Sequence, residues 1–143
     1  MTLRIVLADD HVAYRAYLRS LLEAQGDIVV AAEASDGEGA VSAAREHEPD
    51  IVLLDLVMPG LDGIEAARRI VGQRTSTRVL ALSLHGDSKL VEAMSAAGVS
   101  GYMLKTDPLP DLLQALREVS AGRVFFSPSL GGTDEEVPSS KTS

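Results

Sequence analysis

The chain has 143 residues, 45% of them hydrophobic and 24% charged, and its 13 basic and 21 acidic side chains give a formal charge of −8. This length and composition predict one globular domain and exclude a wholly disordered, collagen-like or disulfide-stapled chain. The sequence contains no cysteine, which removes thiol catalysis and cysteine–zinc sites and is compatible with the cytoplasm, the location that we expect. The acidic excess disfavours direct nucleic-acid binding, and no apolar run approaches the roughly 18 residues of a membrane span.

Short apolar runs recur along the chain and predict strands that are buried on both faces. They lie at Ile5–Ala8, Ile28–Ala32, Ile51–Leu54, Val79–Leu82 and Val99–Leu104. Amphipathic segments between these runs predict helices. They lie at Val12–Gln25, Gly37–His47, Ile64–Gln73, Ser88–Ala97 and Pro108–Ala121. The expected N-caps include Asp36, Asp87 and Asp107, and the expected stops are Gly26, Gly98 and Gly122.

The strict alternation of strands and helices predicts an α/β fold, a single (βα)5 unit with a doubly wound parallel sheet and helices on both faces. After Phe126 the sequence becomes rich in serine, glycine and proline, a composition typical of linkers. We therefore expect a domain at residues 1–126 and a flexible linker or tail at residues 127–143. A linker here suggests a longer parent protein with a further domain, and a disordered tail is the alternative.

Polar side chains follow four of the predicted strands. Asp9 and Asp10 follow the first, Asp55 follows the third, Ser83 ends the fourth and Lys105 follows the fifth. Because ligands bind beyond the carboxyl ends of the strands in an open parallel sheet, we expect these side chains to meet at one edge. Taken alone, each has an ordinary explanation as a turn, cap, loop or surface residue.

The joint arrangement indicates phosphoryl chemistry. Three carboxylates at close range repel one another, and a divalent cation such as Mg²⁺ relieves that repulsion with oxygen ligands. An aspartate at such a site can act as a nucleophile toward phosphorus and form an aspartyl phosphate. Lys105 and the Ser83 hydroxyl are suited to contact the phosphoryl oxygens.

These residues resemble the receiver domain of two-component response regulators over about Leu3 to Phe126. The motifs are Asp9-Asp10-His11, Leu53-Leu54-Asp55-Leu56-Val57-Met58-Pro59-Gly60-Leu61-Asp62-Gly63, Ser83, and Gly101-Tyr102-Met103-Leu104-Lys105. The first motif and the run Ala97–Tyr102 resemble the NarL/FixJ branch, which carries a LuxR-type output domain. The resemblance implies a flavodoxin-like strand order of 2-1-3-4-5.

The resemblance assigns a role to each matching residue. Asp55 is expected to be the phosphoacceptor, taking a phosphoryl group from a phosphohistidine on a sensor histidine kinase. Asp9, Asp10, Asp55 and the Val57 backbone carbonyl are the expected Mg²⁺ ligands, and Mn²⁺ or Ca²⁺ can substitute. Lys105 and Ser83 are the expected phosphoryl contacts.

Ser83 and Tyr102 form the switch pair that the resemblance implies, in which the tyrosine moves inward when the hydroxyl is drawn toward the phosphoryl group. The alternative for Tyr102 is plain packing against the fourth helix, and we weigh the two about equally. His85 is a further candidate at the mouth of the site, although an exposed loop histidine is the simpler interpretation. His11 is expected in the first turn of the first helix rather than on a metal.

The sequence departs from many receivers at two positions. Thr106 follows Lys105 where a cis proline is common, and Leu84 beside Ser83 is bulkier than the usual small residue. Val57 cannot offer a side-chain hydrogen bond to an attacking water. We therefore treat Val57, Leu84 and His85 as rate-tuning positions and expect slow self-dephosphorylation.

The predicted function is that of a signalling domain that phosphorylation switches to control a transcriptional output. It has no turnover substrate. The expected partners are the kinase and a second copy of the chain, with DNA reached only through a C-terminal domain that is absent here. The alternatives are a pseudo-receiver that acts through protein contacts, a dehalogenase-type phosphatase and a flavodoxin-like flavin protein. The phosphatase motif needs an aspartate at Val57, and Asp9-Asp10 would repel the flavin phosphate.

Overall fold

The computed structural model describes residues 2–58, 60–73 and 76–130 and shows a six-stranded parallel sheet in the order β2-β1-β3-β4-β5-β6. The strands are β1 (Leu3–Ala8), β2 (Ile28–Ala34), β3 (Ile51–Leu54), β4 (Arg78–Ser83), β5 (Gly101–Leu104) and β6 (Phe125–Phe126). The helices are α1 (Val12–Glu23), α2 (Gly37–His47), α3 (Gly63–Gly72), α4 (Ser88–Ala96) and α5 (Leu109–Ser120). The doubly wound α/β prediction and its order of the first five strands are therefore confirmed.

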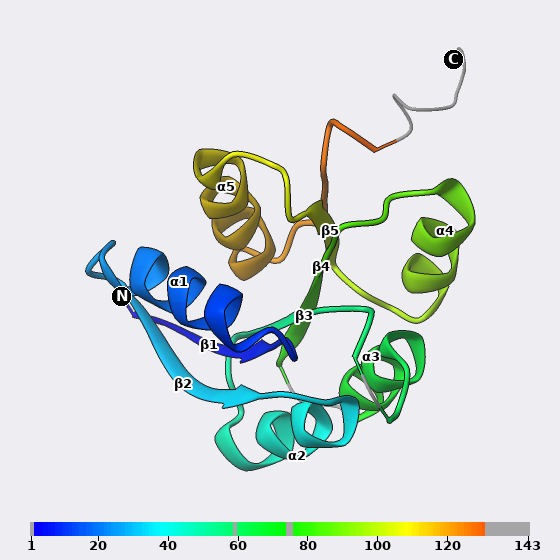
Figure 1. Ribbon diagram of the computed structural model, residues 1–143, viewed down its shortest axis with the longest axis horizontal. Coiled ribbons are helices and arrows are strands. Elements are labelled where there is room, and N and C mark those ends of the chain that lie inside the picture. Colours follow the sequence, from blue (N-terminus) through cyan, green and yellow to red (C-terminus); the bar gives the residue numbers. More distant parts are fainter. Residues whose placement is uncertain (1, 59, 74–75, 131–143) are drawn as a thin grey trace.

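Two apolar layers enclose the sheet (Figure 1). On one face, α1 and α5 supply Leu18, Leu22 and Leu116 to a core that also holds Ile5 and Met103. On the other face, α2, α3 and α4 pack with alanines, Ile70 and Met94 against Val6 and Tyr102. This alternation follows from the strands, because successive side chains of a strand point to opposite faces. Of the helices in the described ranges, none is long and apolar enough to cross a bilayer.

The expected helices are confirmed, with ends that differ by up to two residues, such as Glu23 instead of Gln25 for α1. Asp36 and Asp87 cap α2 and α4 by accepting a hydrogen bond from the backbone N–H of the third residue of each helix. The prediction that Asp107 caps the last helix is wrong, because Pro108 occupies the N-cap position of α5. The Asp107 carboxylate instead accepts a hydrogen bond from the Leu104 backbone N–H at 2.8 Å and thereby closes the turn after β5.

The sixth strand is a feature that the sequence pattern did not reveal, because two residues are too few to show a period. β6 pairs in parallel with β5, with Phe125 opposite Gly101. A β-carbon at Gly101 would lie 2.6 Å from the Phe125 carbonyl oxygen, so this close approach requires glycine. Ser127 is buried and donates its backbone N–H to the Tyr102 carbonyl. Residues 131–143 of the expected tail lie outside the described residues, and the boundary near Ser127 stays a prediction.

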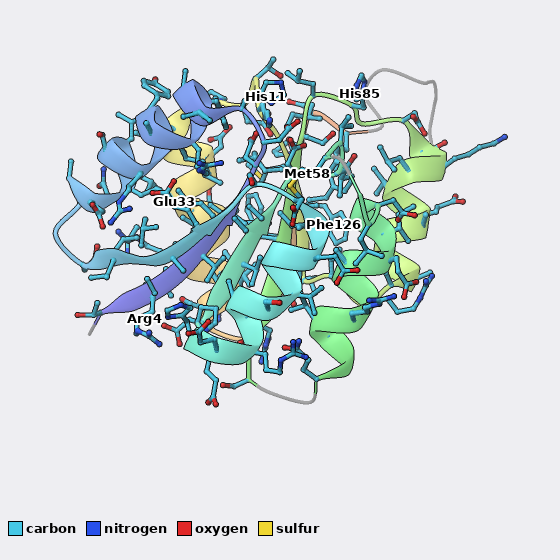
Figure 2. All side chains as sticks on the ribbon, turned by 60° about the horizontal axis from the view of Figure 1, so that its bottom comes forward. Arg4, His11, Glu33, Met58, His85 and Phe126 are labelled. Carbon is cyan, nitrogen blue, oxygen red and sulfur yellow. The ribbon has the colours of Figure 1, made fainter. Side chains whose placement is uncertain are left out.

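The parallel strands deliver their carboxyl ends to one edge of the sheet. Hydrogen bonds between neighbouring strands continue one residue past each strand, through Asp9 N–H to Ala34 at 3.0 Å and Asp55 N–H to Ala8 at 2.9 Å. Lys105 N–H donates in the same way to the Ser83 carbonyl at 2.8 Å. Figure 2 shows His11 and His85 at this edge, with Arg4 at the opposite end. The backbone of the predicted site is therefore held by the sheet itself.

Candidate functional site

Three carboxylates converge at this edge, as predicted. Asp9 and Asp55 are 6% and 4% exposed, whereas the Asp10 side chain is about one-third exposed, at 34%. One ligand atom from each, together with a ring nitrogen of His11, lies within 4.8 Å of all the others. Such proximity between like charges is unfavourable unless a cation compensates it.

Lys105 supplies that compensation. Its Nζ lies 2.7 Å from Asp9 Oδ2 and 3.3 Å from Asp55 Oδ2, and its side chain is 8% exposed. The lysine therefore reaches the phosphoacceptor candidate, but it pairs more closely with Asp9. The ammonium group thus binds the carboxylate of Asp9, which the resemblance implies is a metal ligand.

The two buried carboxyl groups respond in opposite directions. Burial raises the pKa of Asp55, and the Asp9 charge adds to this rise, while the Val57 N–H and Lys105 oppose it. Burial also acts to raise the pKa of Asp9, but hydrogen bonds from Lys105 and the His11 N–H outweigh it and leave that pKa lowered. Asp9 is accordingly the more firmly ionised of the pair.

The donor set fits a hard divalent cation. Asp10 Oδ1 is buried and accepts no hydrogen bond from the described residues, although His11 Nδ1 lies 3.3 Å away. A buried carboxylate oxygen without a donor needs a positive partner. Three aspartates around one point match the all-oxygen coordination of Mg²⁺, with waters completing the shell.

The predicted switch residues are joined through one loop residue. Ser83 is fully buried, and its Oγ accepts the backbone N–H of His85 at 3.0 Å. Tyr102 is fully buried and donates its hydroxyl to the His85 carbonyl. Tyr102 therefore belongs to the same apolar core as Met94 of α4 and also bonds the loop after β4. Both weighed interpretations of this tyrosine agree with the contacts, and its switching role stays a prediction.

The mouth of the site is small and partly apolar. A cavity of about 90 Å³ is lined by His11, Asp55, Val57, Leu84, His85 and Lys105. Leu84 and Val57 are 62% and 58% exposed. All three rate-tuning positions thus border the phosphoacceptor candidate, and their effect on rate stays a prediction.

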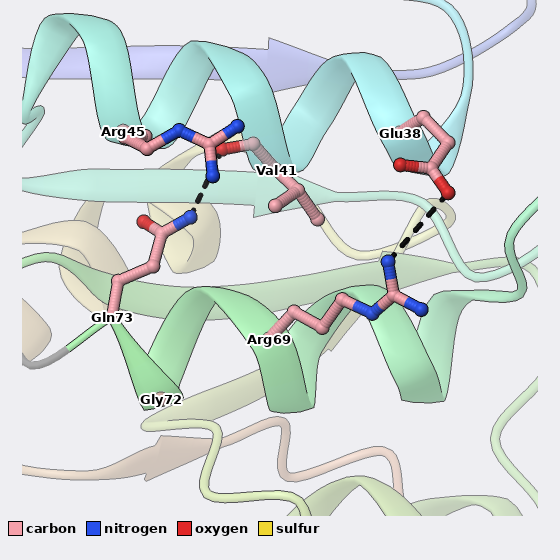
Figure 3. Close-up of a pocket in the computed structure, with 6 residues that line it drawn as sticks. All are labelled: Glu38, Val41, Arg45, Arg69, Gly72 and Gln73. Carbon is pink, nitrogen blue, oxygen red and sulfur yellow. Dashed lines mark hydrogen bonds and ion pairs between the residues drawn. The ribbon is translucent and has the colours of Figure 1, made fainter.

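A larger hollow of about 410 Å³ lies between α2 and α3 (Figure 3). Arg69 pairs with Glu38 across it at 3.6 Å, and Gln73 donates its amide to the Val41 carbonyl at 3.2 Å. None of the strand-end residues lines it. Size alone therefore does not identify the functional site of this molecule.

An arginine–glutamate network behind Asp9 was missed by the sequence interpretation. Arg15 Nη1 donates to the Asp9 backbone carbonyl, and Arg15 Nε and Arg19 Nη1 each pair with Glu33 of β2 at 2.5 Å. The signal was a glutamate within the otherwise apolar run of β2, because a half-buried acid needs a partner. This network fixes the loop that carries the acidic pair.

Replacing Glu33 with glutamine is expected to lower the free energy of unfolding at pH 7 by about 1 kcal/mol. Partial burial acts to raise the pKa of Glu33, but hydrogen bonds from Arg15 and Arg19 outweigh it and lower that pKa below its ordinary 4.5. The stabilisation is therefore present above pH 4.5 and is lost as the pH falls through the folded pKa. Urea unfolding at several pH values measures it. Glu46→Gln, at an exposed position of α2, is the matched control. A difference in unfolding free energy between the wild type and Glu33→Gln that does not shrink as the pH falls below 4.5 would contradict the linkage.

Known proteins similar to this chain belong to the family that the site residues resemble. The family model of the response regulator receiver domain matches residues 5–117. The transcriptional regulatory protein LiaR of Bacillus subtilis is 38% identical over 130 residues, which cover 91% of this chain and 62% of that protein. DegU of Brevibacillus brevis, also called a transcriptional regulatory protein, is 33% identical over 90% of this chain and 54% of its own length. The chain thus spans roughly 54% to 62% of these relatives.

Solved structures extend the likeness to three dimensions. A LuxR-family two-component response regulator from Aurantimonas superposes with a TM-score of 0.87 at 39% identity, covering 91% of this chain and 93% of that one. The signal receiver domain of the putative regulator NarL from Mycobacterium tuberculosis gives 0.82 at 33%, covering 85% and 98%.

The chain belongs to the response regulator receiver family. Within that family it is a receiver of the NarL/FixJ type, as its LuxR-family and NarL neighbours show. Receiver domains of this kind belong to two-component transcriptional regulators.

Proposed function

We propose that Asp55 accepts a phosphoryl group from a phosphohistidine on a sensor histidine kinase, with Mg²⁺ bound beside it. The observation that carries this proposal is the juxtaposition of a buried aspartate with a buried lysine and a second aspartate, at 3.3 Å and 2.7 Å from the ammonium nitrogen. Phosphoryl transfer depends mainly on positioning and on neutralising charge, and this site supplies both.

The transfer requires a nucleophile and a cation in fixed positions. An Asp55 carboxylate oxygen attacks phosphorus, the new P–O bond forms as the P–N bond of phosphohistidine breaks, and the imidazole leaves with the electron pair. Lys105 and the Ser83 hydroxyl donate hydrogen bonds to the phosphoryl oxygens. Asp9, Asp10, Asp55 and the Val57 carbonyl would hold Mg²⁺, which neutralises charge on the same oxygens.

The loop after β4 connects the proposed phosphorylation site with the buried core through hydrogen bonds. Ser83 and Tyr102 hold opposite sides of the His85 backbone, its N–H and its carbonyl. A phosphoryl group on Asp55 would accept a hydrogen bond from the Ser83 hydroxyl and draw this hydroxyl away from the His85 N–H. That movement would disturb the His85 backbone, whose carbonyl accepts the hydrogen bond of Tyr102. The loop after β4 and Tyr102 then have two arrangements, and the charge of the phosphoryl group shifts the equilibrium between them.

In this proposal the chain is the receiver part of a longer cytoplasmic protein, and phosphorylation of the receiver controls transcription. The relatives LiaR and DegU are transcriptional regulatory proteins of greater length, which supports this part of the proposal. Phosphorylation would favour a homodimer, and DNA would be bound by a separate C-terminal domain. The chain promotes its own modification and has no turnover substrate.

The test is the intact mass of the protein after incubation with acetyl phosphate. With Mg²⁺ we expect a gain of one phosphoryl group, and with excess chelator no gain. Asp55→Asn should remain unlabelled under the same conditions because an amide is not a nucleophile toward phosphorus. No gain in the wild type, where a control receiver is labelled, would overturn the proposal and favour a pseudo-receiver that acts by contacts.

A further inference from the structure

Lys105 has a third neighbour that the receiver resemblance does not assign. Its Nζ lies 4.7 Å from the centroid of the Tyr14 ring, on the first turn of α1. A cation over an aromatic face at this range is attracted by the ring quadrupole, most strongly where water is excluded. Because the Lys105 side chain is 8% exposed, this attraction is stronger than it would be at an exposed site.

The ring closes the inner side of the site. Tyr14 borders a void of only about 10 Å³ together with Asp9 and Asp55, which is at the lower limit for one water molecule. The ammonium group therefore faces two carboxylates and an aromatic surface. Burial and the charges of Asp9 and Asp55 also raise the pKa of Tyr14 to about 12, so the phenol is neutral at physiological pH.

These three contacts respond differently to a divalent cation. The shortest one, to Asp9 at 2.7 Å, is made with a carboxylate of the proposed metal site. A cation held there by Asp9 would compete for that carboxylate and would repel the ammonium group. The attraction to the neutral Tyr14 ring is not consumed by the metal. The same ammonium group lies 4.7 Å from the ring centroid and 3.3 Å from Asp55 Oδ2.

We propose that Tyr14 is a positioning residue that keeps the Lys105 ammonium group beside Asp55 when Mg²⁺ displaces it from Asp9. This inference rests on the proposed phosphoacceptor function. It makes the aromatic ring, and not the phenolic hydroxyl, the part of Tyr14 that matters.

The test compares Tyr14→Phe, which keeps the ring, with Tyr14→Leu, which removes it. At saturating Mg²⁺ we expect Tyr14→Leu to be labelled by acetyl phosphate about 5- to 20-fold more slowly than the wild type, and Tyr14→Phe within about twofold of it. Tyr17→Leu is the control for loss of a neighbouring ring, because Tyr17 is 60% exposed and its ring lies 6.4 Å from the Tyr14 ring, whereas the described cation–π contact of Lys105 is made with Tyr14. Thermal unfolding of each variant checks that the fold is kept.

Two further measurements separate positioning from a general effect on structure. In a Lys105→Ala background, adding Tyr14→Leu should slow labelling no further. An equal slowing there, an unaffected Tyr14→Leu, or a Tyr14→Phe as slow as Tyr14→Leu would overturn the inference. An unlabelled wild type would instead refute the proposed function.

The second measurement does not depend on phosphorylation. In the Mg²⁺-bound protein, the ε-methylene protons of Lys105 should keep an upfield ring-current shift in the wild type and in Tyr14→Phe and lose it in Tyr14→Leu. Loss of that shift when Mg²⁺ binds to the wild type would overturn the inference, whatever the labelling rates are.

Discussion

Replacing Lys105 with alanine is expected to tighten Mg²⁺ binding and to slow phosphorylation of Asp55. The ammonium group bonds Asp9 at 2.7 Å, so it competes with any cation for that carboxylate. A hydrogen bond to a charged group is worth about 1.5–3 kcal/mol, which corresponds to a roughly 10- to 100-fold gain in Mg²⁺ affinity. The phosphoryl oxygens lose a preorganised cation in the same variant, which costs about 100-fold or more in rate.

Calorimetric titration with Mg²⁺ and time-resolved intact mass give the two quantities separately. Lys89→Ala, at an exposed lysine of α4, is the matched control and should change neither. Affinity and rate that fall together would show that Lys105 supports metal binding instead of competing with it. Unchanged affinity would show that the contact to Asp9 has no net strength in solution.

The second large effect is expected for Gly37→Ala, at the first residue of α2. A β-carbon there would lie 2.3 Å from the Leu61 carbonyl oxygen and 2.9 Å from the Leu61 β-carbon. Since the nearest atom is backbone, the helix or the segment between β3 and α3 must shift. We expect the free energy of unfolding to fall by about 3 kcal/mol, at the upper end for overpacked sites.

Gly72→Ala is the control for this substitution. Gly72 ends α3, and a β-carbon there would meet nothing within 4 Å. The same chemical change should therefore raise the free energy of unfolding by about 0.5–1 kcal/mol, because alanine loses less backbone entropy than glycine. Urea unfolding of both variants, followed by circular dichroism, measures the pair. Changes of the same sign would contradict the steric explanation for Gly37.

The strand-end residues were predictable because their position follows from topology alone. Once the strands are parallel, the residues after β1, β3 and β5 must meet at one edge, so Asp9, Asp55 and Lys105 were placed together without any knowledge of packing. The preference of Lys105 for Asp9 over Asp55 was not predictable. It depends on side-chain distances of 2.7 Å and 3.3 Å within one cluster.

The missed contacts share a different cause. Tyr14 and Arg15 were assigned to a helix by pattern, but a helical period does not say which neighbour a side chain meets across the sheet. Asp107 followed the N-cap preference for aspartate, and the structure uses its carboxylate to close the turn after β5 instead. For Tyr14 and Arg15 a tertiary contact decides the role, whereas for Asp107 a local turn with Leu104 decides it.

The sixth strand places Leu130 beside the loop that follows β4. After β6, Leu130 packs so close to Gly86 that a β-carbon there would lie 2.7 Å from Leu130 Cδ2, and Ser129 Oγ lies 3.1 Å from Asp107 Oδ1. Gly86 follows His85, the residue held by both Ser83 and Tyr102. A displacement of that loop would therefore press directly on Leu130, the last residue that the structure describes.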